Sequence, residues 1–144
     1  MTGLLVCEAG EPERSVTVPD AAVWVEGSSM YLKRGETLTR RDLLYGMMLH
    51  SGNDAALTLA ISVSGSEAAF VARMNETAKQ MGLDAKYADC CGFIDDGNAV
   101  SPRAMAQLAQ RVIREYPKIL EYSSLKSVSF QGKTFYSTNT LLRD

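Results

Sequence analysis

The chain has 144 residues, of which 46% are hydrophobic, and its formal net charge at pH 7 is −2. This is enough material for one hydrophobic core and gives no case for two domains. Positive and negative residues are mixed along the chain, so it lacks the basic surface expected of a protein that binds nucleic acid. No apolar run approaches the roughly 20 residues that cross a bilayer, and residues 4–6 are too short for a secretion signal.

The first elements predicted in chain order are short. They are a helix end at residues 1–9, a strand at 15–18 and, after a turn at 19–20, a second extended piece at 23–25. Thr39 and Asp42 have the spacing of a capping box, which predicts the start of a helix. The apolar residues between 43 and 49 continue that helix.

Apolar residues recur at helical spacing in three later stretches, residues 55–63, 70–81 and 102–114. Because small alanines allow close packing, we expect the helix of residues 55–63 to be the most buried. Ser66 is the predicted N-cap of the next helix. Ser101, followed by a proline at the first helical position, is the predicted N-cap of the last one.

Two segments outside these helices also have clear signals. Residues 83–100 form a long loop rich in Asp, Gly and Cys, and long loops of this kind often carry function. Val128 and Phe130 on one side, and Phe135 on the other, flank Gln131-Gly132, which predicts a β-hairpin.

The cysteines give no pattern of disulfides or metal ligands. Cys7, Cys90 and Cys91 are odd in number, and the adjacent pair could close only a strained ring. A metal site would need a C-x-x-C spacing or a nearby histidine, and the one histidine is His50. We therefore expect three free or packed thiols and no metal site.

The most informative stretch is Ser51-Gly52-Asn53, which lies between two apolar helical runs. A hydroxyl and a carboxamide two residues apart, held by two helices, suit a group that passes a proton and a group that orients a substrate carbonyl. The alternative is a structural turn, in which one helix stops at the glycine and Asn53 caps the next.

This motif and its flanks resemble the second active-site motif of the serine-type D-Ala-D-Ala carboxypeptidases, the low-molecular-mass penicillin-binding proteins. The resemblance covers nearly the whole chain, in matching order and spacing. It includes residues 1–8, Gly27–Leu32, Leu43–Ala56, Gly65–Met81, Cys91–Phe93 and Thr138–Leu142. It implies an α/β (α+β) fold of the penicillin-recognising serine transpeptidase/β-lactamase-like type. We expect the chain to represent mainly its helical subdomain, with short β-hairpins.

The resemblance also places two motifs outside the chain. The nucleophilic Ser and the Lys of S-x-x-K are expected just upstream of Met1, and K-T-G is expected after Asp144. Lys133-Thr134 does not replace K-T-G, because Phe135 follows it. We therefore expect residues 1–144 to be a single partial catalytic domain that is inactive by itself. If the protein is exported, its signal is expected upstream.

The chemistry implied by the resemblance is removal of the terminal D-Ala from peptidoglycan stem peptides through an acyl-enzyme, without metal or organic cofactor. Ser51 would relay a proton to the departing nitrogen, and Asn53 would donate its side-chain N–H to a substrate carbonyl. Gly52 would leave room for the peptide, with Gly92 and Phe93 at the rim of the groove. The implied partners are stem peptides and β-lactams, at the outer face of the bacterial cytoplasmic membrane or in the cell wall.

Several alternatives stay open. Asp54 with His50 and Ser51 would make a serine triad, but neighbouring residues at a helix end point apart, and Asp54 suits a first-turn carboxylate. Asp95-Asp96 could be a catalytic carboxylate pair, although Gly97-Asn98 favours a solvated turn. At the level of the protein, the alternatives are a class A-like serine β-lactamase and a non-catalytic helical or cell-wall-binding module. Self-association of the chain is also expected, through apolar surface that lacks its flanking strands.

Overall fold

The structure is a computed structural model that describes residues 1–93 and 97–142. The helices are α1 (Thr2–Ala9), α2 (Arg40–His50), α3 (Asn53–Ser64), α4 (Glu67–Gln80), α5 (Pro102–Glu115) and α6 (Lys118–Ser123), with short 3-10 turns at Asp20–Ala22 and Thr140–Leu142. Three antiparallel strand pairs accompany them: β1 (Ser15–Thr17) with β2 (Thr37–Thr39), β3 (Ala85–Lys86) with β4 (Ala99–Val100), and β5 (Ser127–Phe130) with β6 (Lys133–Tyr136).

Helix α3 lies at the centre of the main hydrophobic core. It packs against α2, α4 and α1, and every residue from Asp54 to Ala60 is buried. Ala55 and Ala60 are both fully buried, so neighbouring helices approach α3 closely on more than one side. The prediction that this helix is the most buried is confirmed.

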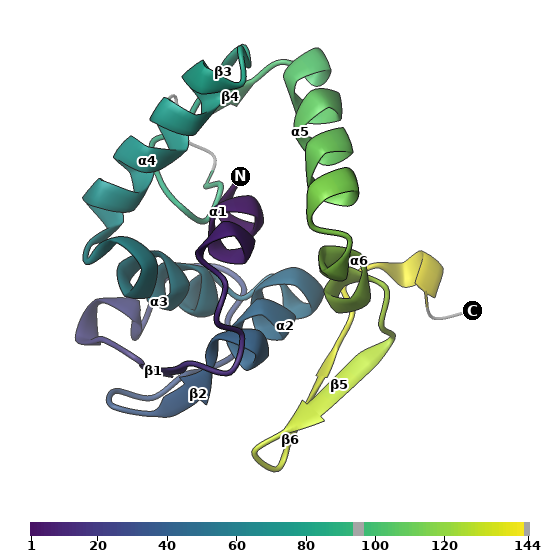
Figure 1. Ribbon diagram of the computed structural model, residues 1–144. Helices are drawn as coiled ribbons and strands as arrows, with labels where there is room; N and C mark the ends of the chain where they lie inside the picture. The colour runs from purple at the N-terminus through teal and green to yellow at the C-terminus, as the bar shows by residue number, and fades with distance from the viewer. Residues whose placement is uncertain (94–96, 143–144) are drawn as a thin grey trace.

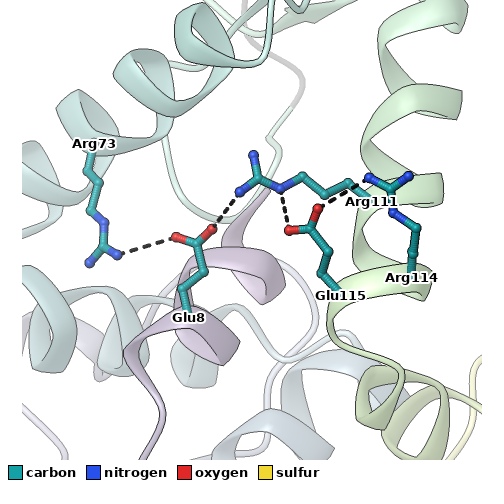
Figure 2. Close-up of polar contacts among 5 residues, drawn as sticks. All are labelled: Glu8, Arg73, Arg111, Arg114 and Glu115. Carbon is teal, nitrogen blue, oxygen red and sulfur yellow. Dashed lines mark hydrogen bonds and ion pairs between the residues drawn. The ribbon is translucent and has the colours of Figure 1, made fainter.

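A second, smaller core lies between α1, α4 and α5, and it is built from Leu4, Ala78, Leu83, Ala104 and Leu108. Figure 1 shows α1 in the space between α4 and α5. Figure 2 shows Glu8 of α1 paired with Arg73 of α4 and Arg111 of α5, both at 3.5 Å. Glu115 continues the network by pairing with Arg111 at 2.9 Å. These charges link the three helices beside their shared apolar core.

The predicted helix caps are present. The side chain of Thr39 accepts a hydrogen bond from Asp42 N at 3.0 Å at the start of α2. Ser66 and Ser101 cap α4 and α5 in the same way. Each cap satisfies one of the backbone N–H groups that a helix start leaves without a partner.

One local prediction is wrong, and one part of the alternative interpretation of the S-G-N turn is not observed. Residues 23–25 do not form the predicted extended piece, because Trp24 has a φ of 71° within a turn. The strand β1 pairs with β2. The N-cap of α3 is Gly52, and Asn53 is its first residue. For Asn53 the capping pattern is local, whereas its backbone N–H and its side chain bind Ser28 and Glu26 in a distant segment.

The C-terminal hairpin is confirmed, with Phe130 opposite Lys133 and Val128 opposite Phe135. Gln131 and Gly132 both have positive φ, the conformation that a two-residue hairpin turn requires. The short helix α6 precedes the hairpin and was not predicted. Within the described residues no single helix is long and apolar enough to cross a membrane; α3 and α4 reach that length and composition only together, bent by 82°.

Candidate active site

The turn between α2 and α3 has a conformation that few residues tolerate. Ser51 ends α2 with a φ of 58°, in the left-handed region. A Cβ atom on Gly52 would lie 3.0 Å from both Met30 Cγ and Asp54 Oδ1, so any side chain there would press on two neighbours. The turn therefore holds the hydroxyl and the carboxamide on either side of a position where a Cβ atom would require both neighbours to shift slightly.

A cavity of about 440 Å³ opens beside this turn. Ser51, Gly52, Asn53 and Gly92 all line it, so four of the five predicted site residues lie on one surface. The start of α1 and the loop before β4 complete the wall. The other lining residues are Met1, Thr2, Gly3, Met47, Met48, Ala56, Met74, Tyr87, Asp89, Cys90, Cys91, Asn98, Ala99, Val100 and Met105.

The fifth predicted residue, Phe93, is not among the lining residues. Its ring is 36% exposed and lies beside Gly27, where a Cβ atom would be 3.8 Å from Phe93 Cε1 and 2.7 Å from Asn53 Nδ2. Phe93 thus lies next to Asn53 across Gly27, while Gly92 faces the cavity itself.

The hydroxyl of Ser51 is exposed and lies 3.4 Å from the hydroxyl of Thr138. Among the described residues lining the cavity there is no Lys, Arg or His. No Lys, Arg or His side chain therefore faces Ser51 from the described wall of this cavity. A hydroxyl without a base passes protons between neighbours more readily than it attacks a carbonyl.

Asn53 is fixed at both its backbone and its side chain. Its N–H donates to Ser28 O at 2.8 Å, and Nδ2 donates to Glu26 O, also at 2.8 Å. A carboxamide has two N–H donors and one carbonyl oxygen, and this contact occupies one donor. The remaining donor and the oxygen are what Asn53 can offer to a substrate.

Asp89 organises the cavity rim, and its role was not predicted. Its Oδ1 accepts hydrogen bonds from the N–H groups of Cys91, Gly92 and Phe93, and its carboxylate also accepts one from Asn98. Burial would raise the pKa of Asp89, but these hydrogen bonds outweigh it and hold the pKa below its ordinary value. The signal in the sequence was an Asp just before a Gly turn, a common site for side-chain-to-backbone bonding.

All three cysteines are free thiols, as predicted. Cys90 Sγ lies 3.7 Å from Cys91 Sγ and 3.3 Å from Glu67 Oε1. The hydrogen bond with Cys91, burial and the nearby Glu67 carboxylate all raise the pKa of the Cys90 thiol. Among the residues the structure describes, no group of three or more His, Cys, Asp or Glu side chains is arranged to hold a metal ion.

The triad interpretation of His50 and Asp54 does not fit the geometry. His50 Nδ1 lies 3.3 Å from the carbonyl of Tyr136, and its ring packs edge-on against Phe135. Asp54 is buried, and its carboxylate accepts hydrogen bonds from four other groups. The Asp95-Asp96 pair lies outside the described residues.

The spacing S-x-x-K occurs once near the end of the chain, at Ser123 and Lys126. Ser123 is the last residue of α6, and its hydroxyl bonds to the Leu120 carbonyl at 3.5 Å. Neither Ser123 nor Lys126 is among the residues that line the cavity. This pair therefore does not supply the nucleophile and base that the cavity lacks.

A family model described as D-alanyl-D-alanine carboxypeptidase matches residues 1–144. This chain belongs to the D-alanyl-D-alanine carboxypeptidase family. The prediction made from the S-G-N motif and its flanks is confirmed.

Individual proteins similar in sequence to this chain are also D-alanyl-D-alanine carboxypeptidases. D-alanyl-D-alanine carboxypeptidase DacD of Salmonella typhimurium is 34% identical over the whole chain, which spans 40% of that protein. D-alanyl-D-alanine carboxypeptidase of Streptomyces sp. strain K15 is 37% identical over 85% of the chain, which spans 43% of that protein. The chain thus corresponds to less than half of these relatives.

Solved structures show the same fold. Penicillin-binding protein 6B from Escherichia coli matches 99% of the chain with a TM-score of 0.91 and 33% identity, over 49% of its own length. Penicillin-binding protein D2 from Listeria monocytogenes in its ampicillin-bound form matches 99% of the chain with a TM-score of 0.83 and 29% identity, over 61% of its length. The chain has the α+β fold of these serine enzymes and represents mostly their helical part with short hairpins.

Proposed function

We propose that this chain is part of the catalytic domain of a serine-type D-Ala-D-Ala carboxypeptidase, which removes the terminal D-Ala of peptidoglycan stem peptides through an acyl-enzyme. Family membership supports the reaction class. The observation that carries the proposal is that Ser51, Gly52, Asn53 and Gly92 line one cavity of about 440 Å³. Such a cavity has the size of an ordinary small-ligand site.

Ser51 and Asn53 would have separate roles in the reaction. A nucleophilic serine and its lysine, supplied by a segment outside these 144 residues, would attack the carbonyl of the penultimate D-Ala. Ser51 would relay the proton to the departing D-Ala nitrogen, for which its exposed hydroxyl and its contact with Thr138 are suited. Asn53, held by Glu26, would orient the substrate amide with its remaining donor.

The start of α1 supports this placement of the nucleophile. Thr2 and Gly3 line the same cavity as Ser51 and Asn53, and Thr2 Oγ1 donates to Cys90 O at 2.8 Å. A segment running into α1 from upstream would therefore arrive at the cavity wall. The single partial domain of residues 1–144, without S-x-x-K and K-T-G, is part of this proposal.

The same proposal covers partners and location. The substrate would be a stem peptide of peptidoglycan, and β-lactams would act as inhibitors, since the Listeria monocytogenes relative has been solved with ampicillin bound. Such a substrate places the protein outside the bacterial cytoplasmic membrane or in the cell wall. Self-association of the isolated chain is also proposed, because Trp24, Tyr31 and Leu141 are each at least 80% exposed.

The test uses the full-length protein with a synthetic stem pentapeptide ending in D-Ala-D-Ala. Release of free D-Ala, together with a stable adduct from a reporter penicillin, is the expected result. Rapid hydrolysis of the penicillin without release of D-Ala would instead identify a β-lactamase. If the protein neither releases D-Ala nor reacts with penicillin, the non-catalytic alternative is correct.

A further inference from the structure

Asp54 follows the S-G-N turn directly, and its carboxylate is one of the few charged groups buried in this structure. It is 1% exposed, in the first turn of α3. A buried carboxylate is costly unless several donors satisfy it. The helix start contributes one of those donors, because Ala55 N lies 2.9 Å from Asp54 Oδ1.

The other donors all come from one segment that is distant in sequence. Oδ1 also accepts a hydrogen bond from Met30 N at 3.0 Å. Oδ2 accepts one from Ser29 Oγ at 2.7 Å and one from Leu32 N at 3.0 Å. With these four bonds, the acceptor capacity of the carboxylate is filled.

The same segment also holds Asn53. Glu26 O accepts from Asn53 Nδ2, and Ser28 O accepts from Asn53 N, both at 2.8 Å. Residues 26–28 are exposed, whereas Met30 and Leu32 are buried. The exposed part that orients the Asn53 amide thus continues directly into the buried part that Asp54 binds.

We propose that Asp54 is a positioning residue: its buried carboxylate ties residues 26–32 to the S-G-N turn and so fixes the direction of the Asn53 side chain. Asp54 touches no substrate in this arrangement and acts through Asn53. The inference rests on the proposed function for its effect on catalysis. The contact between Glu26 and Asn53 can be tested without any activity.

The chemistry predicts that even an isosteric change is disruptive. In Asp54→Asn, an amide nitrogen replaces one carboxylate oxygen, so a donor faces the donors that now surround it. With the amide nitrogen at the Oδ2 position, the acceptor for Ser29 Oγ and Leu32 N is lost. With the nitrogen at the Oδ1 position, the acceptor for Met30 N and Ala55 N is lost, so residues 29–32 lose a backbone bond in either orientation. Because a misplacement of about 1 Å can cost about 100-fold in rate, acylation by a reporter penicillin should slow roughly 100-fold.

The experiment measures acylation and the Asn53 side-chain amide signal by NMR in full-length protein with labelled asparagine. Asp54→Asn should shift the Asn53 Nδ2 signal toward that of a free amide and slow acylation. Asp42→Asn, which changes a first-turn carboxylate on α2 that makes none of these contacts, should do neither. In the Asn53→Ala background, Asp54→Asn should slow acylation no further, because the two residues act in series.

A second variant with a smaller change keeps the test valid if Asp54→Asn does not fold. Ser29→Ala removes one of the four bonds and leaves the backbone donors, so acylation should slow about fivefold, again only when Asn53 is present. A folded Asp54→Asn or Ser29→Ala protein with unchanged Asn53 signal and unchanged acylation would overturn the inference, as would additive effects with Asn53→Ala. If the unmodified protein does not react with penicillin, the proposed function fails, and the amide signal alone decides the role of Asp54.

Discussion

At the scale of single residues, the site depends on conformations that the chain must be forced to adopt. Ser51 is a non-glycine residue in the left-handed region, which costs conformational energy unless its surroundings hold it there. Helices α2 and α3 end and begin on either side of it, and the Gly46 carbonyl accepts the N–H of Gly52 at 3.1 Å. Strain of this kind is found where placement matters for function.

Replacing each of the two polar residues of the turn in the full-length protein should change a different kinetic step. Asn53→Ala should slow acylation by peptide and by penicillin alike, by about 100-fold, because the amide orients both. Ser51→Ala should lower kcat more than it changes KM, because proton relay acts in the transition state. Steady-state and single-turnover kinetics measure both, with Ser64→Ala at the far end of α3 as the control. Purely KM-type effects of equal size from both changes would contradict these roles.

Asp89 should make stability depend on pH at the acid end. Its folded pKa lies below the ordinary carboxyl value, so the unfolded state binds the proton more readily. The stabilisation it provides is complete above the unfolded pKa of about 4 and is lost as the pH falls through the lower folded pKa.

Urea unfolding at neutral pH and near pH 3 measures this. The stability difference between the unmodified protein and Asp89→Asn should be largest at neutral pH and should shrink on acidification. Asp84→Asn, at an exposed position just before β3, is the control and should show no such trend. If the difference in unfolding free energy between the unmodified protein and Asp89→Asn stays constant from neutral pH to about pH 3, the rim hydrogen bonds do not depend on the charge of Asp89.

At the scale of elements, α3 is the support of the site. Its alanines let α2, α4 and α1 approach, and its first two residues are Asn53 and Asp54. Gly46 on α2 shows how close that packing is, because a Cβ atom there would lie 1.8 Å from Met30 Sδ. The helices and the segment at residues 26–32 are therefore fitted to one another around the turn.

Ala60→Leu should destabilise the protein by about 1–3 kcal/mol through overpacking. Ala60 is fully buried, so the larger side chain has no free space to enter. Ala109→Leu, at an exposed position in the interior of α5, is the matched control and should be close to neutral. Denaturant unfolding measures both, and equal stability of the two variants would show that α3 is not tightly packed.

At the scale of the whole molecule, the apolar surface is incompletely covered. On α5 only Ala104 and Leu108 are buried, while Met105 and Ile113 on the same helix are about half exposed. Figure 1 shows α5 apart from α2 and α3, joined to them mainly through α6. The Glu8 ion pairs in Figure 2 link α5 to α1 and α4.

The 144 residues by themselves should form no covalent adduct with penicillin. An acyl-enzyme needs an activated nucleophile, and among the described residues that line the cavity no Lys, Arg or His stands beside Ser51. Intact-mass measurement after incubation with a reporter penicillin is the test, with the full-length protein as the positive control. A stoichiometric adduct on the 144-residue chain would show that it contains its own nucleophile.

Much of this arrangement was determined by the sequence alone. The caps at Thr39, Ser66 and Ser101, the buried helix α3 and the C-terminal hairpin follow from periodicity and from side chains that bond their own backbone, which are local effects. The S-G-N motif with its flanks was enough to indicate the family. Helix α6 was missed because six residues after a proline carry too little periodicity to detect.

Only the tertiary structure decided how the site is held. Asp54 and Asn53 both bind residues 26–32, and these are contacts between segments that no local pattern relates. A carboxylate in the first turn of a helix looks the same in sequence whether water or another segment satisfies it. Burial makes the difference, because a charge removed from water must find its donors within the fold.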